Sequence, residues 1–279
     1  MNTVDYEVQM EAYLNHLRRE EYSLATITQY CRDVRRFLVF LGSDALDREV
    51  VLRYKKELEQ DYRPISVNAK LSALNSFFSF IGRGDLKLKF MKIQQSPYCS
   101  EEKELSREEY LLLVKTAKKQ KNEKLALLLQ TICGTGIRVS EVRYITVEAV
   151  NRGEAVIRLK GKTRMILLPE KLRKVLKAYA RREKITDGPV FVTRTGRPLD
   201  RSNIWKMMKR LCRDAGVDEK KVFPHNLRHL FARCFYSADK DIAKLADILG
   251  HSSIDTTRIY IITSGTEHRR RLDRLGLVL

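Results

Sequence analysis

The first eighty residues repeat one pattern, in which apolar side chains recur three and four positions apart until a turn residue ends the run. This spacing places the apolar side chains on one face of a helix. Four such runs are present, at residues 7–18, 23–41, 47–58 and 64–81. Ser23 or Thr26 can cap the second run, and Gly42 can end it. Pro64 can start the fourth run, and Gly82 can end it. The pattern therefore predicts a compact bundle of four short helices.

The helical pattern breaks after residue 82. Small and turn-forming residues interrupt the basic stretch that follows, namely Gly84, Ser96, Pro97 and Ser100. Such a stretch is typical of a linker. A new helix start comes next, because Ser106 and Glu109 match the capping box. We therefore predict an N-terminal domain at residues 1–83, a linker at residues 84–103 and a second domain at residues 104–279.

The second domain combines helical runs with one pair of strands. The apolar run at residues 125–132 predicts a buried helix, and residues 202–215 predict a basic helix whose Trp205 belongs in the core. Residues 155–159 and 164–168 read as two strands around a turn at residues 160–163. The expected fold class is therefore α+β, mainly α with a small β-sheet.

The charge of the chain indicates its class of partner. It has 54 Lys and Arg against 35 Asp and Glu, a formal net charge of +19. Such an excess usually meets a polyanion, with nucleic acid as the obvious candidate, although a merely soluble basic protein is the alternative. In the N-terminal domain Arg35, Arg63 and Lys70 suit a surface laid along a duplex, where phosphate contacts add salt-sensitive affinity. Each could instead be ordinary solvated charge.

Several classes of protein are not indicated. The five cysteines are widely spaced and form no Cys-x-x-Cys pair, which fits reduced thiols rather than disulfides or a zinc site. We find no signal peptide, no membrane-spanning apolar run, no carboxylate cluster for Mg²⁺ and no nucleotide-binding glycine loop. We expect a cytoplasmic, nucleoid-associated protein without a metal ion or cofactor.

One candidate site residue follows a glycine-rich turn. The octapeptide at residues 134–141 reads Gly-Thr-Gly-Ile-Arg-Val-Ser-Glu. Its glycines can end the preceding helix, and Glu141, three residues after Arg138, can lie beside the guanidinium and fix it. A structural ion pair at a helix start is the alternative reading.

A second set of candidates lies in the predicted hairpin. Lys160 and Lys162 stand in its turn, and Arg164 begins its second strand. All three are candidate contacts to a phosphate backbone.

The most informative stretch lies near the end of the chain. His225 and Arg228 stand at i and i+3, so both side chains leave one face of a helix. Gly250 can end the next helix, with His251 directly after it, and Tyr260 arrives nine residues later. Arginine binds phosphate oxygens bidentately, histidine can donate a hydrogen bond or move a proton near neutral pH, and a tyrosine can attack phosphorus. A lone histidine or tyrosine here would usually be core or surface, but the joint spacing favours phosphodiester chemistry.

These motifs resemble the tyrosine recombinase (phage integrase) family. The resemblance rests on His-x-x-Arg, on Leu-Gly-His with a Tyr nine residues later, on Thr-Gly-x-Arg-x-Ser-Glu and on the lysine-bearing hairpin. Residues 26–33 are also similar to the Thr-x-x-x-Tyr-x-x-Asp pattern of that family's core-binding domain. The chain departs mildly from the family, with Ile145 where Leu is usual and Glu148-Ala149 near a usual Asp.

The resemblance implies a fold and a mechanism. It implies a four-helix SAM-like core-binding domain, a mixed catalytic domain and a hinge that lets both close around DNA. Tyr260 would be the nucleophile that leaves a 3′-phosphotyrosyl enzyme. Arg138 and Arg228 would clamp the phosphate. His251 would add a donor, and His225 would accept the tyrosine proton or hold the site together. Lys160 would be the general acid, with Lys162 as the runner-up.

The resemblance also implies the partners, which are double-stranded DNA and further copies of the chain in a tetramer on two DNA sites. The basic tail at residues 268–279 would dock on a neighbouring subunit. The compact length is closest to Xer-type enzymes. Chromosome dimer resolution, phage integration and transposon movement all remain open. A type IB topoisomerase and a non-catalytic DNA-binding regulator are the alternative functions.

Overall fold

The computed structural model describes residues 3–93, 104–159, 162–251, 253–261 and 273–274. The chain divides into two compact units, Met1–Gln95 and Ser96–Leu279. Helices dominate both, and one two-stranded sheet is present among the described residues, which confirms the predicted fold class. Within the same ranges, no helix has the combination of length and apolar character that crossing a bilayer requires.

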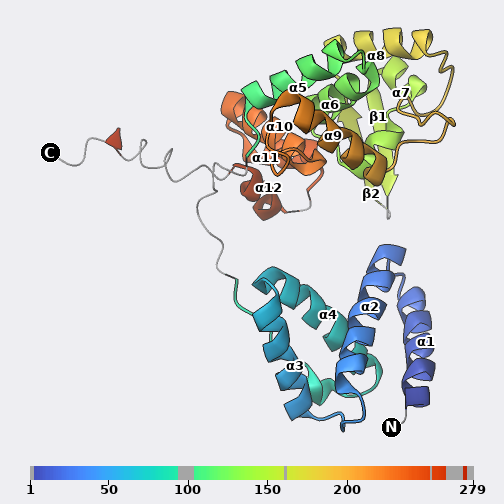
Figure 1. Cartoon of the computed structure of the whole chain (residues 1–279), viewed down its shortest axis with the longest axis vertical. Coiled ribbons are helices and arrows are strands. Elements are labelled where there is room, and N and C mark those ends of the chain that lie inside the picture. Colours follow the sequence, from blue (N-terminus) through green and yellow to red (C-terminus); the bar gives the residue numbers. More distant parts are fainter. Residues whose placement is uncertain (1–2, 94–103, 160–161, 252, 262–272, 275–279) are drawn as a thin grey trace. The chain divides into compact units, whose positions relative to one another are not determined.

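The first unit is a bundle of four helices (Figure 1). They are α1 (Thr3–Arg19), α2 (Leu24–Leu41), α3 (Arg48–Asp61) and α4 (Pro64–Phe80). Ser23 caps α2 by accepting a hydrogen bond from the Thr26 backbone N–H at 3.2 Å. Aromatic side chains fill the core, where Phe37 lies edge-on to Phe78 with ring centres 5.6 Å apart. The four predicted helices are confirmed.

The first unit continues past the predicted domain boundary. A short 3₁₀ helix, η1 (Gly84–Leu86), is followed by an extended segment that packs on α4. Asn75 exchanges two hydrogen bonds with the backbone of Leu88, at 2.8 and 2.9 Å, and Asn68 does the same with Met91. Residues 84–93 therefore belong to the first unit, and the linker predicted at residues 84–103 begins too early. Residues 94–103 lie outside the described part of the chain.

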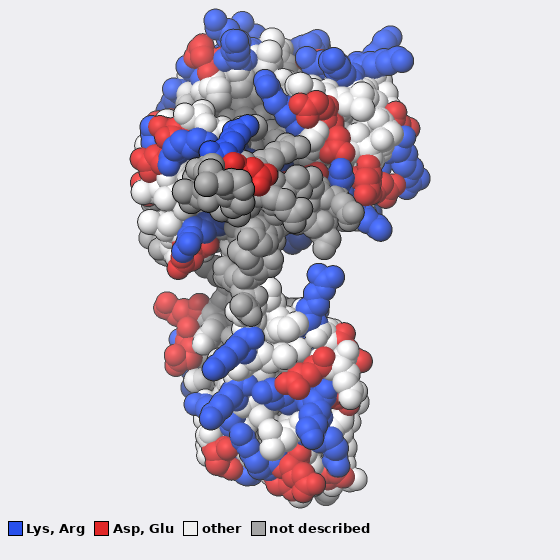
Figure 2. All heavy atoms as spheres, turned by 90° about the vertical axis from the view of Figure 1, so that its left-hand side faces the viewer, with Lys and Arg blue, Asp and Glu red and all other residues white. Residues whose placement is uncertain are grey.

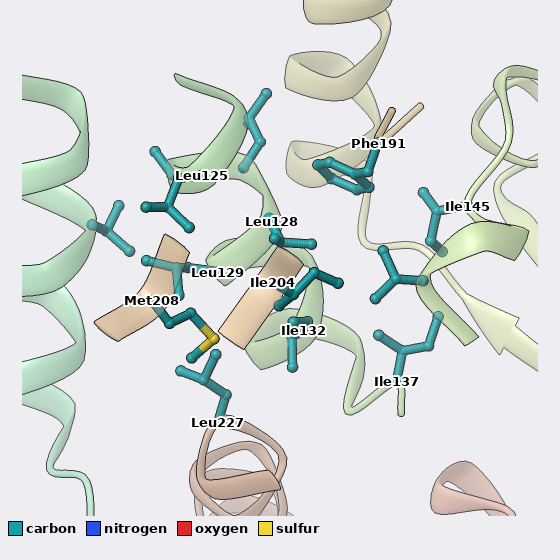
Figure 3. Close-up of a cluster of buried hydrophobic side chains, with 14 of the residues drawn as sticks. Leu125, Leu128, Leu129, Ile132, Ile137, Ile145, Phe191, Ile204, Met208 and Leu227 are labelled. Carbon is teal, nitrogen blue, oxygen red and sulfur yellow. The ribbon is translucent and has the colours of Figure 1, made fainter. Parts of the chain in front are cut away.

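The second unit builds its core around one buried helix. Its helices are α5 (Arg107–Lys119), α6 (Glu123–Thr135), η3 (Val139–Tyr144), α7 (Val147–Arg152), α8 (Glu170–Arg182), α9 (Arg201–Ala215), α10 (Pro224–Asp239), α11 (Ile242–Leu249) and α12 (Ile254–Ile261). Leu125, Leu128 and Ile132 of α6 point into the core, where they meet side chains of α9 and α10 (Figure 3). Ser106 and Glu109 form the predicted capping box at the start of α5.

The sheet is an antiparallel hairpin of β1 (Glu154–Leu159) and β2 (Lys162–Leu167). Leu159 pairs with Lys162, so only residues 160–161 separate the paired ends. The predicted turn at residues 160–163 was therefore too long. In an antiparallel pair successive side chains alternate between faces, so Ile157, Arg164 and Ile166 face inward, whereas Met165 and Leu167 are exposed.

Trp205 is not in the core, contrary to the prediction. It is 50% exposed, and the Lys209 ammonium lies 5.5 Å from its ring centre. The buried face of α9 is formed by Ile204, Met208, Leu211, Cys212 and Ala215. Trp205 follows that stripe by one residue, which turns it about 100° away from the core.

Candidate active site

Arg138 is positioned by the turn after α6. Gly136 ends the helix in the left-handed region with φ 62°, and a Cβ there would lie only 2.5 Å from the ring of Phe231. Arg138 follows two residues later and donates to Glu141 twice, from its backbone N–H at 3.0 Å and from Nη1 at 2.9 Å. Glu141 is buried, whereas the Arg138 side chain is 41% exposed, so this guanidinium can still meet a ligand.

Arg228 lies at the centre of the site on α10 and is only 2% exposed. Its Nη1 donates to the Gly136 carbonyl at 2.6 Å, and its Nη2 donates to the Leu249 carbonyl at 2.7 Å. The same Nη2 lies 2.8 Å from Nε2 of His251. Its Nε is buried without a hydrogen-bond partner among the described residues.

The last turn of α11 binds three arginines through three successive carbonyl oxygens. Ile248 accepts from Arg164 at 2.8 Å, and Leu249 accepts from Arg228. Gly250 accepts from Nη2 of Arg138 at 3.1 Å. The three arginines come from β2, α10 and the turn before η3. Helix C-terminal carbonyls carry partial negative charge, so this end of α11 holds the cations together.

Tyr260 lies within a cluster of imidazole rings. Its ring centre is 4.2 Å from that of His229, 5.3 Å from that of His225 and 5.3 Å from that of His251. The guanidinium carbon of Arg228 lies 5.8 Å from the same ring centre. Tyr260 itself is only 6% exposed. The fold therefore brings Tyr260, His225, Arg228 and His251 together.

The imidazoles of the site resist protonation. Burial lowers the pKa of His251 to about 4, and the positive charges of Arg228 and Arg138 act in the same direction. Burial, together with His225, lowers the pKa of His229 to about 4. The pKa of His225 is lowered by burial and by Arg228. Burial and the charge of Arg138 also lower the pKa of Arg228, to about 10. The site thus holds neutral rings beside two cations, which suits an anionic ligand.

The two lysine candidates are not placed equally. Lys160 lies outside the described residues. Lys162 begins β2 opposite Leu159, and only its backbone is described. The choice between the two lysines stays a prediction.

Arg164 is not a free phosphate contact, contrary to the prediction. Its side chain is 11% exposed and donates to Glu141 at 2.8 Å as well as to the Ile248 carbonyl. The residue sits on the inward face of β2, where its charge is used within the protein.

The three predicted DNA contacts of the first unit differ in availability. Arg35 and Arg63 are exposed, in line with a phosphate contact. Lys70 is not: its side chain is 13% exposed and its ammonium lies 3.0 Å from a carboxylate oxygen of Asp33, which is buried. Figure 2 shows Lys and Arg side chains on the visible face of each unit, with acidic side chains between them.

Two residues of the cluster were missed in the sequence. His229 follows Arg228 and stands four residues after His225, so helical spacing alone could have placed it on the same face. Thr257 is fully buried, and its hydroxyl lies 2.8 Å from Nδ1 of His251. No sequence signal singles out Thr257, because this contact depends on how α12 folds back on the preceding turn.

The comparisons with known proteins agree with this arrangement. Residues 103–266, more than half of the chain, match the phage integrase family, and residues 10–84 match the phage integrase N-terminal SAM-like domain. The chain is 31% identical to tyrosine recombinase XerA of Thermococcus kodakarensis over 94% of this chain and 93% of the relative. It is 29% identical to tyrosine recombinase XerA of Pyrococcus furiosus, over 96% and 94%.

A solved structure shows the same fold. A lambda integrase tetramer bound to a Holliday junction superposes with a TM-score of 0.72 at 16% identity, covering 91% of this chain and 76% of that one. Together with the two family matches, these similarities identify the chain as a member of the phage integrase family and as a tyrosine recombinase.

Proposed function

We propose that the chain is a site-specific DNA recombinase that cuts and rejoins DNA through Tyr260. The observation that carries the proposal is the position of Tyr260, which is buried beside Arg228 and lies in one cluster with His225 and His251. A phenol beside two imidazoles and a guanidinium is the set of groups that a phosphoryl transfer to tyrosine needs.

In this mechanism the Tyr260 oxygen attacks the scissile phosphorus. The bond from phosphorus to the 5′-oxygen breaks, which leaves a 3′-phosphotyrosyl enzyme and a free 5′-hydroxyl. Arg138 and Arg228 stabilise the charge on the nonbridging oxygens, where loss of one preorganised donor typically costs about 10²–10³ in rate. His225 lies close enough to Tyr260 to accept its proton, and the neutral His251 ring lies beside the same phenol.

The departing 5′-oxygen needs a proton. We assign this role to Lys160, with Lys162 as the alternative, because both belong to the hairpin whose inward face contacts the site through Arg164. The covalent link conserves the phosphodiester bond energy, so rejoining needs only the reverse attack by a 5′-hydroxyl.

Admission of a phosphate requires a rearrangement. Tyr260 and Arg228 are both almost completely buried, and the tyrosine ring lies beside the guanidinium. We infer that DNA binding moves α12 away from α10 far enough to admit the scissile phosphate. Tyr260, which is carried on α12, then attacks the phosphate that Arg228 binds.

The partners in this proposal are double-stranded DNA and three further copies of the chain. Strand exchange between two duplexes needs several subunits, and the related fold of lambda integrase was solved as a tetramer on a Holliday junction. Exposed Arg35 and Arg63 suit contacts of the first unit to the phosphate backbone. We therefore expect the protein to be associated with DNA in the cell.

The experiment first recovers the DNA that the chain traps. Fragments linked to the protein after denaturation are sequenced, and the site found is built into two labelled duplexes. We expect wild type to exchange strands between them, and Tyr144→Phe to do the same, because the Tyr144 hydroxyl contacts Arg143 outside the cluster. Relaxation of supercoiled DNA without exchange would instead support a topoisomerase, and binding without cleavage would support a regulator.

A further inference from the structure

Arg164 joins three parts of the second unit. It belongs to β2, its Nη1 donates to the Glu141 carboxylate at 2.8 Å, and its Nη2 donates to the Ile248 carbonyl at 2.8 Å. These partners lie in η3 and at the end of α11. One guanidinium therefore links the hairpin to the two segments that surround Arg138.

Arg164 packs directly against the backbone of Gly250. A Cβ on Gly250 would lie 2.3 Å from Cδ of Arg164 and 2.8 Å from its Nε. Real Cβ contacts do not reach such distances, so the Arg164 side chain occupies space that only a glycine leaves open. The side chain is 11% exposed, so DNA cannot draw it outward without breaking two charge-assisted hydrogen bonds.

Arg164 contacts both groups that hold the Arg138 guanidinium. Glu141 binds Nη1 of Arg138 through one carboxylate oxygen, and its other oxygen is shared between the Arg138 backbone N–H and Arg164. The second support of Arg138 is the Gly250 carbonyl, two residues after the carbonyl that Arg164 binds. Without Arg164, the Glu141 carboxylate would keep only its two hydrogen bonds to Arg138 itself, and the last turn of α11 would lose one of its anchors.

We propose that Arg164 is a positioning residue for phosphate recognition: it holds Glu141 and the end of α11 in the geometry that directs the Arg138 guanidinium at the scissile phosphate. This assignment rests on the proposed function. A bidentate arginine is required, because a lysine ammonium cannot span the carboxylate and the carbonyl with the same planar fork.

The test uses two versions of a nicked suicide duplex built on the recovered site. One carries the normal scissile phosphodiester, and the other carries a methylphosphonate, in which a methyl group replaces a charged nonbridging oxygen. An enzyme that has lost its arginine clamp is impaired on the charged substrate far more than on the neutral one. A general loss of structure slows both equally.

The variants are Arg164→Met and Arg164→Lys, with Arg158→Met as the matched control. Arg158 is an exposed arginine on β1 of the same hairpin. We expect both Arg164 variants to cleave the phosphodiester more slowly by up to about 10²-fold, the loss that a misplacement of about 1 Å can cause. The methylphosphonate rate and the DNA affinity should change little, and Arg138→Ala should show the same substrate pattern. Arg158→Met should match wild type on both substrates.

The outcomes separate the assignment from the function. Equal slowing of both substrates, or normal cleavage of both by the Arg164 variants, would overturn the positioning role alone. No cleavage by wild type would overturn the proposed function and the assignment with it. Should Arg164→Met not fold, Arg164→Lys retains the buried charge beside Glu141 and decides the question.

Discussion

Nη2 of Arg228 lies 2.8 Å from Nε2 of His251. A guanidinium nitrogen only donates, so Nε2 accepts and the His251 ring is neutral, with its proton on Nδ1. Nδ1 faces the Thr257 hydroxyl at 2.8 Å, which accepts that proton's hydrogen bond. The buried arginine and the buried threonine together select one tautomer of His251.

The first prediction concerns this tautomer. Thr257→Val keeps the shape of the fully buried side chain but removes the acceptor for Nδ1 of His251. A neutral hydrogen bond is worth about 1 kcal/mol, so we expect stability to fall by that amount. The same loss of His251 orientation in the transition state should lower the cleavage rate by up to about tenfold. Single-turnover cleavage and urea unfolding measure the two effects. Thr257→Ser keeps the hydroxyl acceptor and should retain the wild-type cleavage rate. A Thr257→Val enzyme with the wild-type cleavage rate and the wild-type stability would contradict the role of Thr257 as the acceptor for His251.

The second prediction concerns pH. His229 and His251 protonate near pH 4 in the folded chain, whereas an unfolded histidine protonates near pH 6.5. Between these values the unfolded chain binds more protons, so the contribution of the two histidines to the free energy of unfolding falls as pH falls from 6.5 to 4. Well above pH 6.5 this contribution is constant. We expect a loss of about 1–3 kcal/mol for these partly exposed groups.

Urea unfolding followed by the fluorescence of Trp205, the single tryptophan of the chain, measures that slope in the second unit. The double variant His229→Phe and His251→Asn should flatten it. His16→Gln, in the first unit, should leave it unchanged. An unchanged slope in the double variant would show that other groups cause the acid sensitivity.

The third prediction concerns His229, whose ring centre lies 4.2 Å from that of Tyr260 at an angle of 30° between the rings. Because burial keeps His229 neutral, it acts as a packing partner for the phenol ring. His229→Phe should therefore retain cleavage, whereas His229→Ala should lose the stacking, which is worth about 0.5–1.5 kcal/mol. Cleavage rates and thermal unfolding of the two variants check this. A His229→Phe enzyme as slow as His229→Ala would mean that a ring nitrogen is needed.

The fourth prediction concerns the first unit. The carboxylate of Asp33 is buried and accepts from Lys70 at 3.0 Å and from Gln29 at 2.5 Å. Asp33→Asn loses the charge-assisted bond, so we expect the first unit to lose about 1–3 kcal/mol. Hydrogen exchange of peptides from α2 and α4 measures it. Asp44→Asn, which removes an exposed ion pair with Arg53, should cost at most about 1 kcal/mol. Equal effects of both variants would contradict the importance of burial.

Local signals in the sequence were sufficient for most of the helices. Ser23, Pro64 and the Ser106 capping box act within a few residues, so a helix start can be read without knowing its surroundings. The positions of His225 and Arg228 on one helix face, and of Tyr260 on a helix after the Gly250 turn, could likewise be predicted from local patterns. These features needed no knowledge of distant contacts.

The features that the sequence did not reveal depend on contacts between distant segments. Arg164 looks like any basic residue on a strand, and its burial depends on a carbonyl 84 residues later in the chain. The end of the first unit was placed too early because residues 87–93 are held by Asn68 and Asn75, which bond their backbone instead of packing a periodic apolar face. Trp205 was placed in the core from its residue type, although the stripe of α9 excludes it.

The most direct test of the account is the identity of the side chain that binds DNA. Wild type and Tyr260→Phe are incubated with the nicked suicide duplex, denatured and digested, and the nucleotide-linked peptide is sequenced by mass spectrometry. We predict a denaturation-resistant adduct on Tyr260 in wild type and none in Tyr260→Phe. An adduct on another residue, or an equal yield from Tyr260→Phe, would contradict the assignment of Tyr260 as the nucleophile.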